Sequence, residues 1–311
     1  MKALNEILDA VKADTDEVMK KNPPVEEADP HELDANGLPD AQNRTWFRLD
    51  EVVAVFADLQ NSTQLGTGTK HAASTAAIYR AATGNVVTIF HEFEADFIQI
   101  QGDGAFGLFW GEQAVERALC AGITVKTFSE ETLVPKLESR WEDDPETGFK
   151  VGIGVGRVLV KNIGTPRNEN EQEPVWAGKP VNYAAKAAQQ ASRHELIVTG
   201  SVWDAIENND YLTSSCAHGD GISPSPLWED VAIKRLTHDE DEAKGRLLKA
   251  AWCSTCGPDF VTAILDGKTE REEADEARNE AKAFKSTLWE AAAERRRASR
   301  ARKRGIHVRR R

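Results

Sequence analysis

The chain has 311 residues, of which 40% are hydrophobic, so it can bury an ordinary globular core in one large domain or two small ones. Its formal net charge of -12 makes the protein as a whole repel nucleic acid and anionic membranes. No apolar run approaches the length of a membrane span, and the start of the chain is typical of a charged amphipathic helix rather than a signal peptide. We therefore expect a cytoplasmic protein, in which a small anionic substrate needs a local positive site such as a bound metal.

The N-terminal part of the chain predicts a helix, a linker and a buried strand, in that order. Apolar residues recur at helical spacing within residues 1–22. Residues 23–44 contain four prolines among acidic residues and asparagines, a composition typical of a loop or linker. The core is expected to begin near Phe47, and the continuous apolar run at residues 52–57 predicts a central buried strand.

The next segment predicts two helices around a hairpin. Residues 71–94 and 112–141 are typical of helices. Between them, residues 97–101 and 105–109 predict two strands that a Gly-Asp-Gly turn joins. The hairpin would carry its aspartate at the tip.

A second hairpin and a third helix follow. Residues 151–156 and 157–160 predict two more strands, and residues 164–174 a polar loop. A helix at about 179–192 and a short strand at 196–198 come next. Strands mixed with helices, with two hairpins, indicate an α+β sheet with helices packed on it rather than a doubly wound parallel sheet.

The C-terminal third has a weaker pattern. A small helix is expected from Ser201, a last strand at 247–252 and a charged helix at 268–304, whereas residues 207–245 indicate no clear element. Residues 295–311 contain ten Lys or Arg and no acid. Such a tail can touch nucleic acid, membrane or an acidic partner. We interpret it as a solvated terminus, which can neutralise acidic residues of the same oligomer.

Four cysteines are too few for a disulfide framework in a chain of this size. Three of them, Cys216, Cys253 and Cys256, combine with His218 into four candidate zinc ligands. The spacing Cys-x-His is unusual for structural zinc, and a lone Cys-x-x-Cys is weak support. The sequence alone therefore favours unrelated thiols in loops and at a strand end.

Two aspartates occupy the ends of expected central strands. Asp58 follows the apolar strand at 52–57, and Asp103 lies in the Gly-Asp-Gly turn. A carboxylate at such a position is costly to bury unless it meets a cation. If the two strands are neighbours, both carboxylates can meet one or two Mg²⁺ or Mn²⁺ ions, which prefer oxygen ligands. The alternative for each aspartate is ordinary turn chemistry.

Four motifs occur along the chain in an order that can be compared with that of known families. They are Phe-Ala-Asp-Leu-Gln-Asn-Ser-Thr at 56–63, Gln-Gly-Asp-Gly at 101–104, Val-Gly-Ile-Gly-Val-Gly at 151–156, and Gly-Lys-Pro-Val-Asn-Tyr-Ala-Ala-Lys at 178–186. Together they resemble the catalytic domain of the class III nucleotidyl cyclases, over about residues 48–206. The resemblance implies a ferredoxin-like βαββαβ core with an antiparallel or mixed sheet. It also implies a head-to-tail homodimer with active sites at the subunit interface.

The resemblance assigns roles to residues of this chain. Asp58, Asp103 and the backbone carbonyl of Leu59 match the ligands of two metal ions, Mn²⁺ or Mg²⁺. Asn182 and Lys186 match the catalytic residues that orient the ribose and touch the triphosphate; they share one helix face. The family has Arg where this chain has Lys186, which keeps the charge but loses the bidentate fork.

Further residues match substrate contacts. The backbone amides after Leu59 lie at the start of an expected helix, where they can bind the β- and γ-phosphates. Arg167, in the polar loop, can hold the same phosphates. The full set of implied substrate-binding residues is Gln99, Leu59, Gln60, Asn61, Ser62, Thr63 and Arg167.

The base that the enzyme reads is indicated by two positions, Gln99 and Val175. Adenylyl cyclases tend to have Lys and Asp there, and guanylyl cyclases Glu and Cys, so neither purine code is present. The Gln99 amide both donates and accepts, which suits a pyrimidine edge. With the N-terminal helix and charged C-terminal extension, this departure resembles the bacterial pyrimidine cyclases of the Pycsar antiphage systems. The resemblance implies cyclic UMP or cyclic CMP as product, with UTP favoured as substrate, and a separate effector protein that the product activates.

We accordingly expect an N-terminal helix and linker at 1–46, a catalytic domain at 47–260, and a charged C-terminal helix with a basic tail at 261–311. A divergent adenylate cyclase and a degenerate cyclase domain that senses nucleotides are the alternatives. A diguanylate cyclase would need a Gly-Gly-Asp/Glu-Glu-Phe run at the hairpin, which this chain does not have. The net charge argues against a nucleic-acid-binding protein.

Overall fold

A computed structural model of the chain describes residues 3–35, 37–67, 72–141, 146–165, 168–218, 224–276 and 289. The chain divides into two compact units. The sheet unit comprises Met1–Ile206 and Trp228–Trp252, and the small unit comprises Glu207–Leu227 and Cys253–Arg311. The small unit thus takes residues from both sides of the boundary expected at 260.

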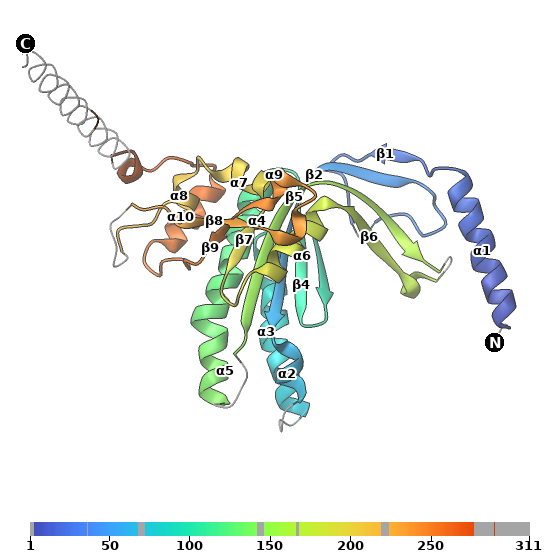
Figure 1. Ribbon diagram of the computed structural model, residues 1–311, viewed down its shortest axis with the longest axis horizontal. Coiled ribbons are helices and arrows are strands. Elements are labelled where there is room, and N and C mark those ends of the chain that lie inside the picture. The colour runs from blue at the N-terminus through green and yellow to red at the C-terminus, as the bar shows by residue number, and fades with distance from the viewer. Residues whose placement is uncertain are drawn as a thin grey trace, which may run out of the picture. The chain divides into compact units, whose positions relative to one another are not determined.

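The described residues of the sheet unit form one nine-stranded mixed sheet (Figure 1). Its strands are β1 (Val25–Glu27), β2 (Trp46–Gln60), β3 (Phe97–Gln101), β4 (Gly104–Phe109), β5 (Gly148–Gly164), β6 (Gln172–Gly178), β7 (Leu196–Val198), β8 (Trp228–Ala232) and β9 (Lys244–Leu248). The main order is β3-β4-β2-β5-β7-β9-β8, while β1 pairs with β2, and β6 with β5. Only the pairs β1–β2 and β5–β7 are parallel among these ladders.

Helices connect these strands in the order expected for the core. The sheet unit contains α1 (Leu4–Lys20), α2 (Ser62–Thr67), α3 (Ala72–Glu92), α4 (Ala114–Phe128), a π-helical turn (Ser129–Leu133), α5 (Val134–Arg140), α6 (Lys179–Gln190), α7 (Gly200–Ile206) and α9 (Glu240–Ala243). The run β2-α3-β3-β4-α4-β5 is the βαββαβ unit, and its four strands lie side by side as β3-β4-β2-β5. The predicted α+β fold with a ferredoxin-like core is therefore confirmed.

Glycines in β5 decide how α6 packs on the sheet. Successive side chains of a strand point to opposite faces. Val151 and Ile153 face α4, where they lie against Gly122, whereas Gly152 faces α6. A Cβ on Gly152 would overlap the backbone carbonyl of Ala184. The repeated Gly in the β5 motif thus lets the backbone of α6 lie directly on the strand.

One strand replaces the second hairpin that the sequence predicts at 151–160. Strand β5 continues from Gly148 to Gly164, and the register shift between Leu49 and Val52 of its partner β2 lies opposite Gly156. The hairpin instead joins β5 to β6, which occupies part of the expected polar loop. Apolar Val158 and Val160 are fully buried, so core packing keeps the strand continuous where its glycines suggested a turn.

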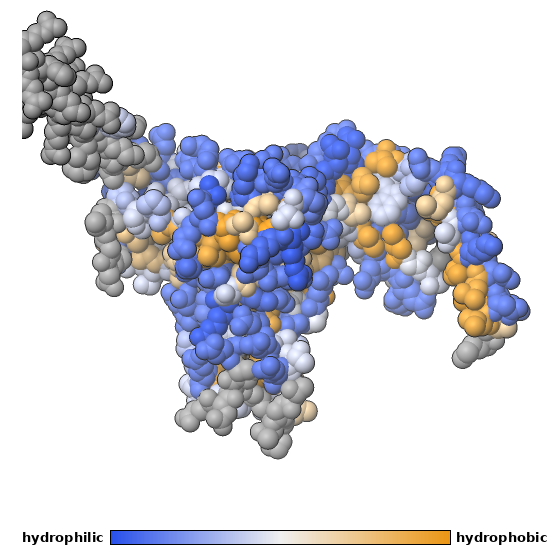
Figure 2. Space-filling model, viewed as in Figure 1, coloured by the Kyte–Doolittle hydropathy of each residue, from blue (hydrophilic) through white to orange (hydrophobic). Residues whose placement is uncertain are grey.

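The two ends of the chain agree with the sequence to different extents. Helix α1 confirms the predicted N-terminal helix, and its apolar side chains, including Leu4 and Leu8, are exposed along one side (Figure 2). In the small unit, α8 (Asp210–Thr213) and α10 (Gly257–Leu265) were not predicted. Most of the charged helix expected at 268–304, and the whole basic tail at 295–311, lie outside the described residues. None of the helices within the described ranges is long and apolar enough to cross a membrane.

Candidate active site

Asp58 and Asp103 lie at the same end of two neighbouring strands. Strands β2 and β4 are antiparallel, and Ala57 pairs with Ala105, so Asp58 near the end of β2 lies beside the turn that precedes β4. A Cβ on Gly104 would overlap the carbonyl of Ala57, which shows how closely the turn approaches β2. The neighbouring-strand geometry on which the metal hypothesis depends is therefore present.

The turn that carries Asp103 is held from two sides. Gly102 has a φ of 65°, a left-handed conformation that glycine adopts at little cost. From α3, the hydroxyl of Thr83 donates a hydrogen bond to the backbone carbonyl of Asp103 at 2.9 Å. These contacts fix the backbone of Asp103, whose side chain is half-buried.

Lys150 is a member of this site that sequence reasoning missed. It lies opposite Asp58 in the β2–β5 ladder, and its Nζ is 2.6 Å from Asp58 Oδ2. The two side chains are 16% and 31% exposed, so the pair is only partly screened by water. The ammonium demonstrates that the Asp58 carboxylate is oriented toward a cation. A lysine directly before the glycine-rich run of β5 was the available signal.

The segment after Asp58 begins its helix later than expected. Strand β2 continues through buried Leu59 to Gln60. Asn61 then has a left-handed φ of 58°, and its side-chain amide donates to the Glu146 carbonyl at 2.7 Å. Helix α2 starts at Ser62, with Thr63 in its first turn. Asn61 is therefore the single residue between the end of β2 and the start of α2.

Asn182 and Lys186 lie on α6, one helical turn apart. The Asn182 amide is exposed and donates to the Gly178 carbonyl at 2.9 Å. The Lys186 ammonium lies 5.3 Å from the centre of the Tyr183 ring. Tyr183 itself is buried and donates to Asp239 Oδ2 at 3.1 Å; burial and this carboxylate raise the pKa of its hydroxyl. Tyr183 thus anchors the helix while its two neighbours stay available.

Gln99 has a partner that sequence reasoning missed. Its side-chain amide donates to Glu173 Oε2 at 3.4 Å, which joins β3 to β6. Val175, the position inferred from the sequence, lies two residues along β6 and is 39% exposed. Residues two apart in a strand share a face. Glu173 therefore lies on the same face of β6 as Val175. Unlike the Val175 side chain, its carboxylate can accept hydrogen bonds beside Gln99. Arg167 lies outside the described residues.

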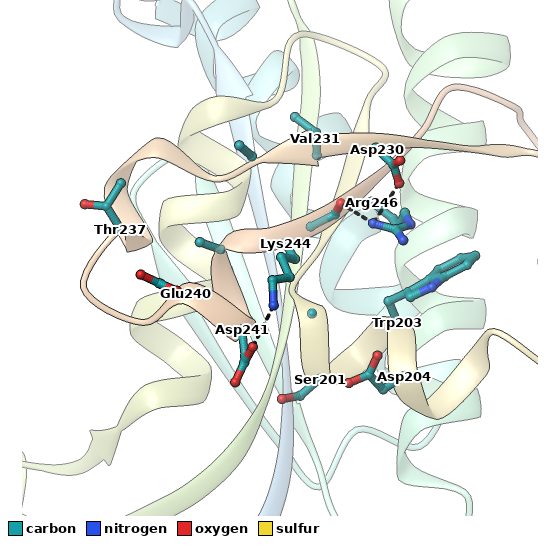
Figure 3. A pocket seen from close by; sticks show the side chains of 14 residues that line it. Ser201, Trp203, Asp204, Asp230, Val231, Thr237, Glu240, Asp241, Lys244 and Arg246 are labelled. Carbon is teal, nitrogen blue, oxygen red and sulfur yellow. Dashed lines mark hydrogen bonds and ion pairs between the residues drawn. The ribbon is translucent and has the colours of Figure 1, made fainter.

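A separate pocket of about 950 Å³ lies between α7, α9 and the β8–β9 hairpin (Figure 3). None of the predicted site residues lines it. Its cations are already paired: Lys244 lies 2.8 Å from Asp241, and Arg246 lies 2.8 Å from Asp230. The Arg246 guanidinium also covers the Trp203 ring at 4.9 Å. This pocket is therefore not the triphosphate site that the aspartate pair indicates.

Comparison with known proteins places the chain among cyclases. No protein-family model matches it. A uridylate cyclase of Micromonospora echinofusca is 51% identical over 280 residues, which is 89% of this chain and 90% of that protein. A uridylate cyclase of Propioniciclava tarda is 51% identical over 271 residues, which is 86% of each.

Among solved structures, a class III adenylyl cyclase-like ATP-binding protein from Pseudomonas aeruginosa is similar in fold. Its TM-score is 0.51 at 19% sequence identity, and the match covers 91% of this chain and 53% of that one. This likeness agrees with the βαββαβ core. Identity of 51% along most of both relatives settles the assignment at the level of sequence: the chain belongs to the uridylate cyclase family.

Proposed function

We propose that this enzyme converts UTP into 3′,5′-cyclic UMP and pyrophosphate. The observation that carries the proposal is the 51% identity to two proteins named uridylate cyclase. The pair Asp58 and Asp103 on neighbouring strands supports it, because cyclisation of a triphosphate needs a cation site beside the reacting phosphate. The 3′-oxygen of the ribose would attack the α-phosphorus, and pyrophosphate would leave.

Two divalent ions, Mn²⁺ or Mg²⁺, fit the donor set at the end of β2 and β4. The carboxylates of Asp58 and Asp103 and the backbone carbonyl of Leu59 would hold them, and hard cations prefer such oxygen ligands. The contact between Asp58 and the Lys150 ammonium supports this, since the carboxylate already faces a positive charge. Bound ions would lower the pKa of the 3′-hydroxyl and neutralise charge on the leaving pyrophosphate.

The family resemblance implies a site shared between two subunits, with α6 supplying its residues to the partner. A Cβ on Gly154 would meet the Pro180 carbonyl at 3.0 Å, so the start of α6 lies over Gly154. Gly154 is four residues along β5 from Lys150, or about 13 Å at the rise of a strand. Helix α6 then continues over Gly152, where a Cβ would overlap the carbonyl of Ala184, so Asn182 lies between these two levels of β5. In a head-to-tail homodimer, Asn182 and Lys186 of one subunit would hold the ribose and α-phosphate at the aspartates of the other.

The remaining phosphate contacts are inferred from the family resemblance. Gln60, Asn61, Ser62 and Thr63 form the corner between β2 and α2 and would offer backbone amides to the β- and γ-phosphates. Arg167 would add a charge to the same phosphates. Catalysis would then depend mainly on positioning and electrostatics, with no covalent intermediate.

Lys150→Gln is expected to lower the Mn²⁺ concentration for half-maximal activity by about tenfold. The ammonium competes with the metal for Asp58, and loss of a partly buried charge of this kind is worth about a factor of ten. The measurement is pyrophosphate release against Mn²⁺ concentration at saturating UTP. Lys136→Gln, at an exposed lysine of α5, is the control. An unchanged Mn²⁺ requirement in Lys150→Gln would contradict the proposed competition.

Glu173 and Gln99 would read the uracil edge as a pair. The Gln99 amide can donate to a uracil carbonyl, while the Glu173 carboxylate can accept the hydrogen of N3. Glu173→Gln is expected to reduce the ratio of kcat/KM for UTP to that for CTP by at least about tenfold, because the amide can also donate to N3 of cytosine. Glu171→Gln, two residues earlier and exposed, should keep the ratio. Equal ratios in both variants would remove Glu173 from base recognition.

Incubation of the purified protein with each of UTP, CTP, ATP and GTP in the presence of Mn²⁺ tests the substrate directly. Mass spectrometry of the products should find cyclic UMP as the main product. Cyclic AMP from ATP alone would overturn the pyrimidine assignment, and absence of any cyclic product would favour a nucleotide sensor.

The resemblance to the Pycsar systems extends the proposal beyond the reaction. The product would act in the cytoplasm as a second messenger of antiphage defence and would activate a separate effector protein. Expression of an Asp58→Asn variant beside the wild type in phage-challenged cells tests this role, because protection should require cyclase activity.

A further inference from the structure

The small unit brings three cysteines and a histidine together. The Sγ atoms of Cys216, Cys253 and Cys256 and a ring nitrogen of His218 all lie within 4.8 Å of one another. All three thiols are free. The sequence-based interpretation as unrelated thiols is therefore wrong about their placement. It failed because the intervening residues 228–252 belong to the sheet unit, so two distant segments complete the small unit.

The cluster has the composition and dimensions of a zinc site. Zinc binds thiolate sulfur at about 2.3 Å and imidazole nitrogen at about 2.0 Å in a tetrahedron, which puts the ligand atoms of this set about 3.5–3.8 Å apart. A mutual limit of 4.8 Å is close to this arrangement. Three sulfurs and one nitrogen fill all four positions of a tetrahedral ion and leave no open place for substrate. Such a closed set is typical of structural rather than catalytic zinc.

The backbone of the Cys-x-x-Cys turn folds closely around the sulfur of Cys253. The amides of Cys256 and Thr255 donate hydrogen bonds to that sulfur. The Gly257 amide donates to the Cys253 carbonyl at 2.8 Å, which closes the turn, and Cys256 then caps α10. The loop is thus shaped to present two sulfurs to the same point.

The segment that carries the other two ligands is fixed by Arg271. Its guanidinium donates to the carbonyls of Ser214, at 2.9 Å, and Ser215, at 3.2 Å, directly before Cys216. Its backbone amide donates to Asp210 Oδ2 at 3.0 Å, and its side chain is only 6% exposed. Arg271, which follows the Cys-x-x-Cys turn in the chain, therefore links the two segments that supply the ligands.

The apolar core of the small unit is small, so a bound metal would add to its stability. In its described part, the buried apolar side chains are Leu212, Cys256, Ala263, Ile264 and Ala274. Only Leu212 and Ile264 are large aliphatic side chains. Units of this size rarely bury enough apolar surface to be stable alone, and a structural metal is a common remedy.

We propose that Cys216, His218, Cys253 and Cys256 bind one structural Zn²⁺ ion, which joins the two segments of the small unit. The ion is distinct from those proposed at Asp58 and Asp103, and the proposal does not depend on the cyclase activity. Zinc binding would be coupled to folding of this unit, because its ligands are far apart in the sequence.

The test uses the full chain, purified without chelator and exchanged into metal-free buffer. Elemental analysis is expected to find about one zinc per chain. His218→Ala and Cys253→Ser should each reduce the zinc content at least about tenfold, whereas Cys120→Ala, at the buried cysteine of α4, should keep it. Full zinc content in both ligand variants, or no zinc in the wild type even after refolding with added Zn²⁺, would overturn the proposal.

Cobalt substitution distinguishes a variant that has lost a metal ligand from one that has lost zinc because it misfolds. Exchange of the wild type into Co²⁺ should give the visible bands of a tetrahedral thiolate site. His218 is exposed, so His218→Cys should fold and retain binding with a shifted spectrum, while His218→Ala should lose the bands. An octahedral spectrum, or alkylation that shows a Cys253–Cys256 disulfide in the freshly purified chain, would contradict zinc binding. Each readout is independent of cyclic nucleotide formation.

Discussion

Asp58→Asn and Asp103→Asn are each expected to reduce formation of cyclic UMP by at least about a thousandfold. Asparagine keeps the size of the side chain but removes the negative charge that would hold a divalent ion. Asp58 and Asp103 lie at the same end of neighbouring strands, so neither can replace the other as a ligand without movement of the sheet. The measurement is pyrophosphate release with saturating UTP and Mn²⁺, together with the thermal unfolding temperature of each variant.

Asp50→Asn provides the matched control for this prediction. Asp50 lies on the same strand, β2, but it pairs with Arg157 at 2.8 Å and Arg48 at 3.2 Å toward the other end. Its substitution should leave the rate within about twofold of the wild type, since exposed ion pairs contribute little. If Asp103→Asn kept more than about a tenth of the activity, the aspartate pair would not be the metal site.

Asn182→Ala is expected to reduce the rate by about a hundredfold, and a mixture with Asp58→Asn should regain activity. Loss of one positioning or charge-stabilising group typically costs a factor of this size. If Asn182 serves the aspartates of the other subunit, a mixed dimer contains one site with an intact Asp58 and an intact Asn182. Unfolding and refolding an equal mixture should therefore recover about a quarter of the wild-type rate, because about half of the dimers are mixed and each has one complete site.

A second mixture separates this exchange from a general effect of refolding. Asp58→Asn refolded with Asp103→Asn should stay inactive, because both changes fall on the same half of the site and every site keeps one defect. Differently tagged chains would show by co-purification that mixed dimers form. Formation of mixed dimers without recovery in the first mixture would place Asn182 and Asp58 of one chain in the same site.

Local patterns in the sequence were sufficient for the core fold. Three elements could be predicted from residues that are close together in the sequence, and all three are confirmed. They are the strand before Asp58, the hairpin turn at Asp103 and the amphipathic helix around Asn182. That β5 is one continuous strand could not be predicted from residues close together in the sequence. Its glycines are typical of a turn, but they serve close packing of α6, and that requirement exists only in three dimensions.

Contacts between distant residues account for what sequence reasoning missed at the site. Lys150 meets Asp58 only because β2 and β5 pair in one particular register. Glu173 meets Gln99 only because β6 exists as a strand and passes close to β3. Glu173 and Val175 share one face of β6, so the sequence alone could not show which of them lies beside Gln99.

The interruption of the small unit by residues 228–252 sets an order for its assembly during synthesis. The stretch 207–227 leaves the ribosome before its partners. Tyr211 packs against Phe260 of α10, and Asp210 accepts a hydrogen bond from the Arg271 amide, so both contacts form only after these later residues have been made. By then β8 and β9, which lie between the two stretches in the chain, are available to join the sheet. A nascent chain that stops at residue 252 would contain every strand that the structure describes, together with a 207–227 segment that still lacks its packing partners. Proteases and chaperones recognise such incompletely folded chains.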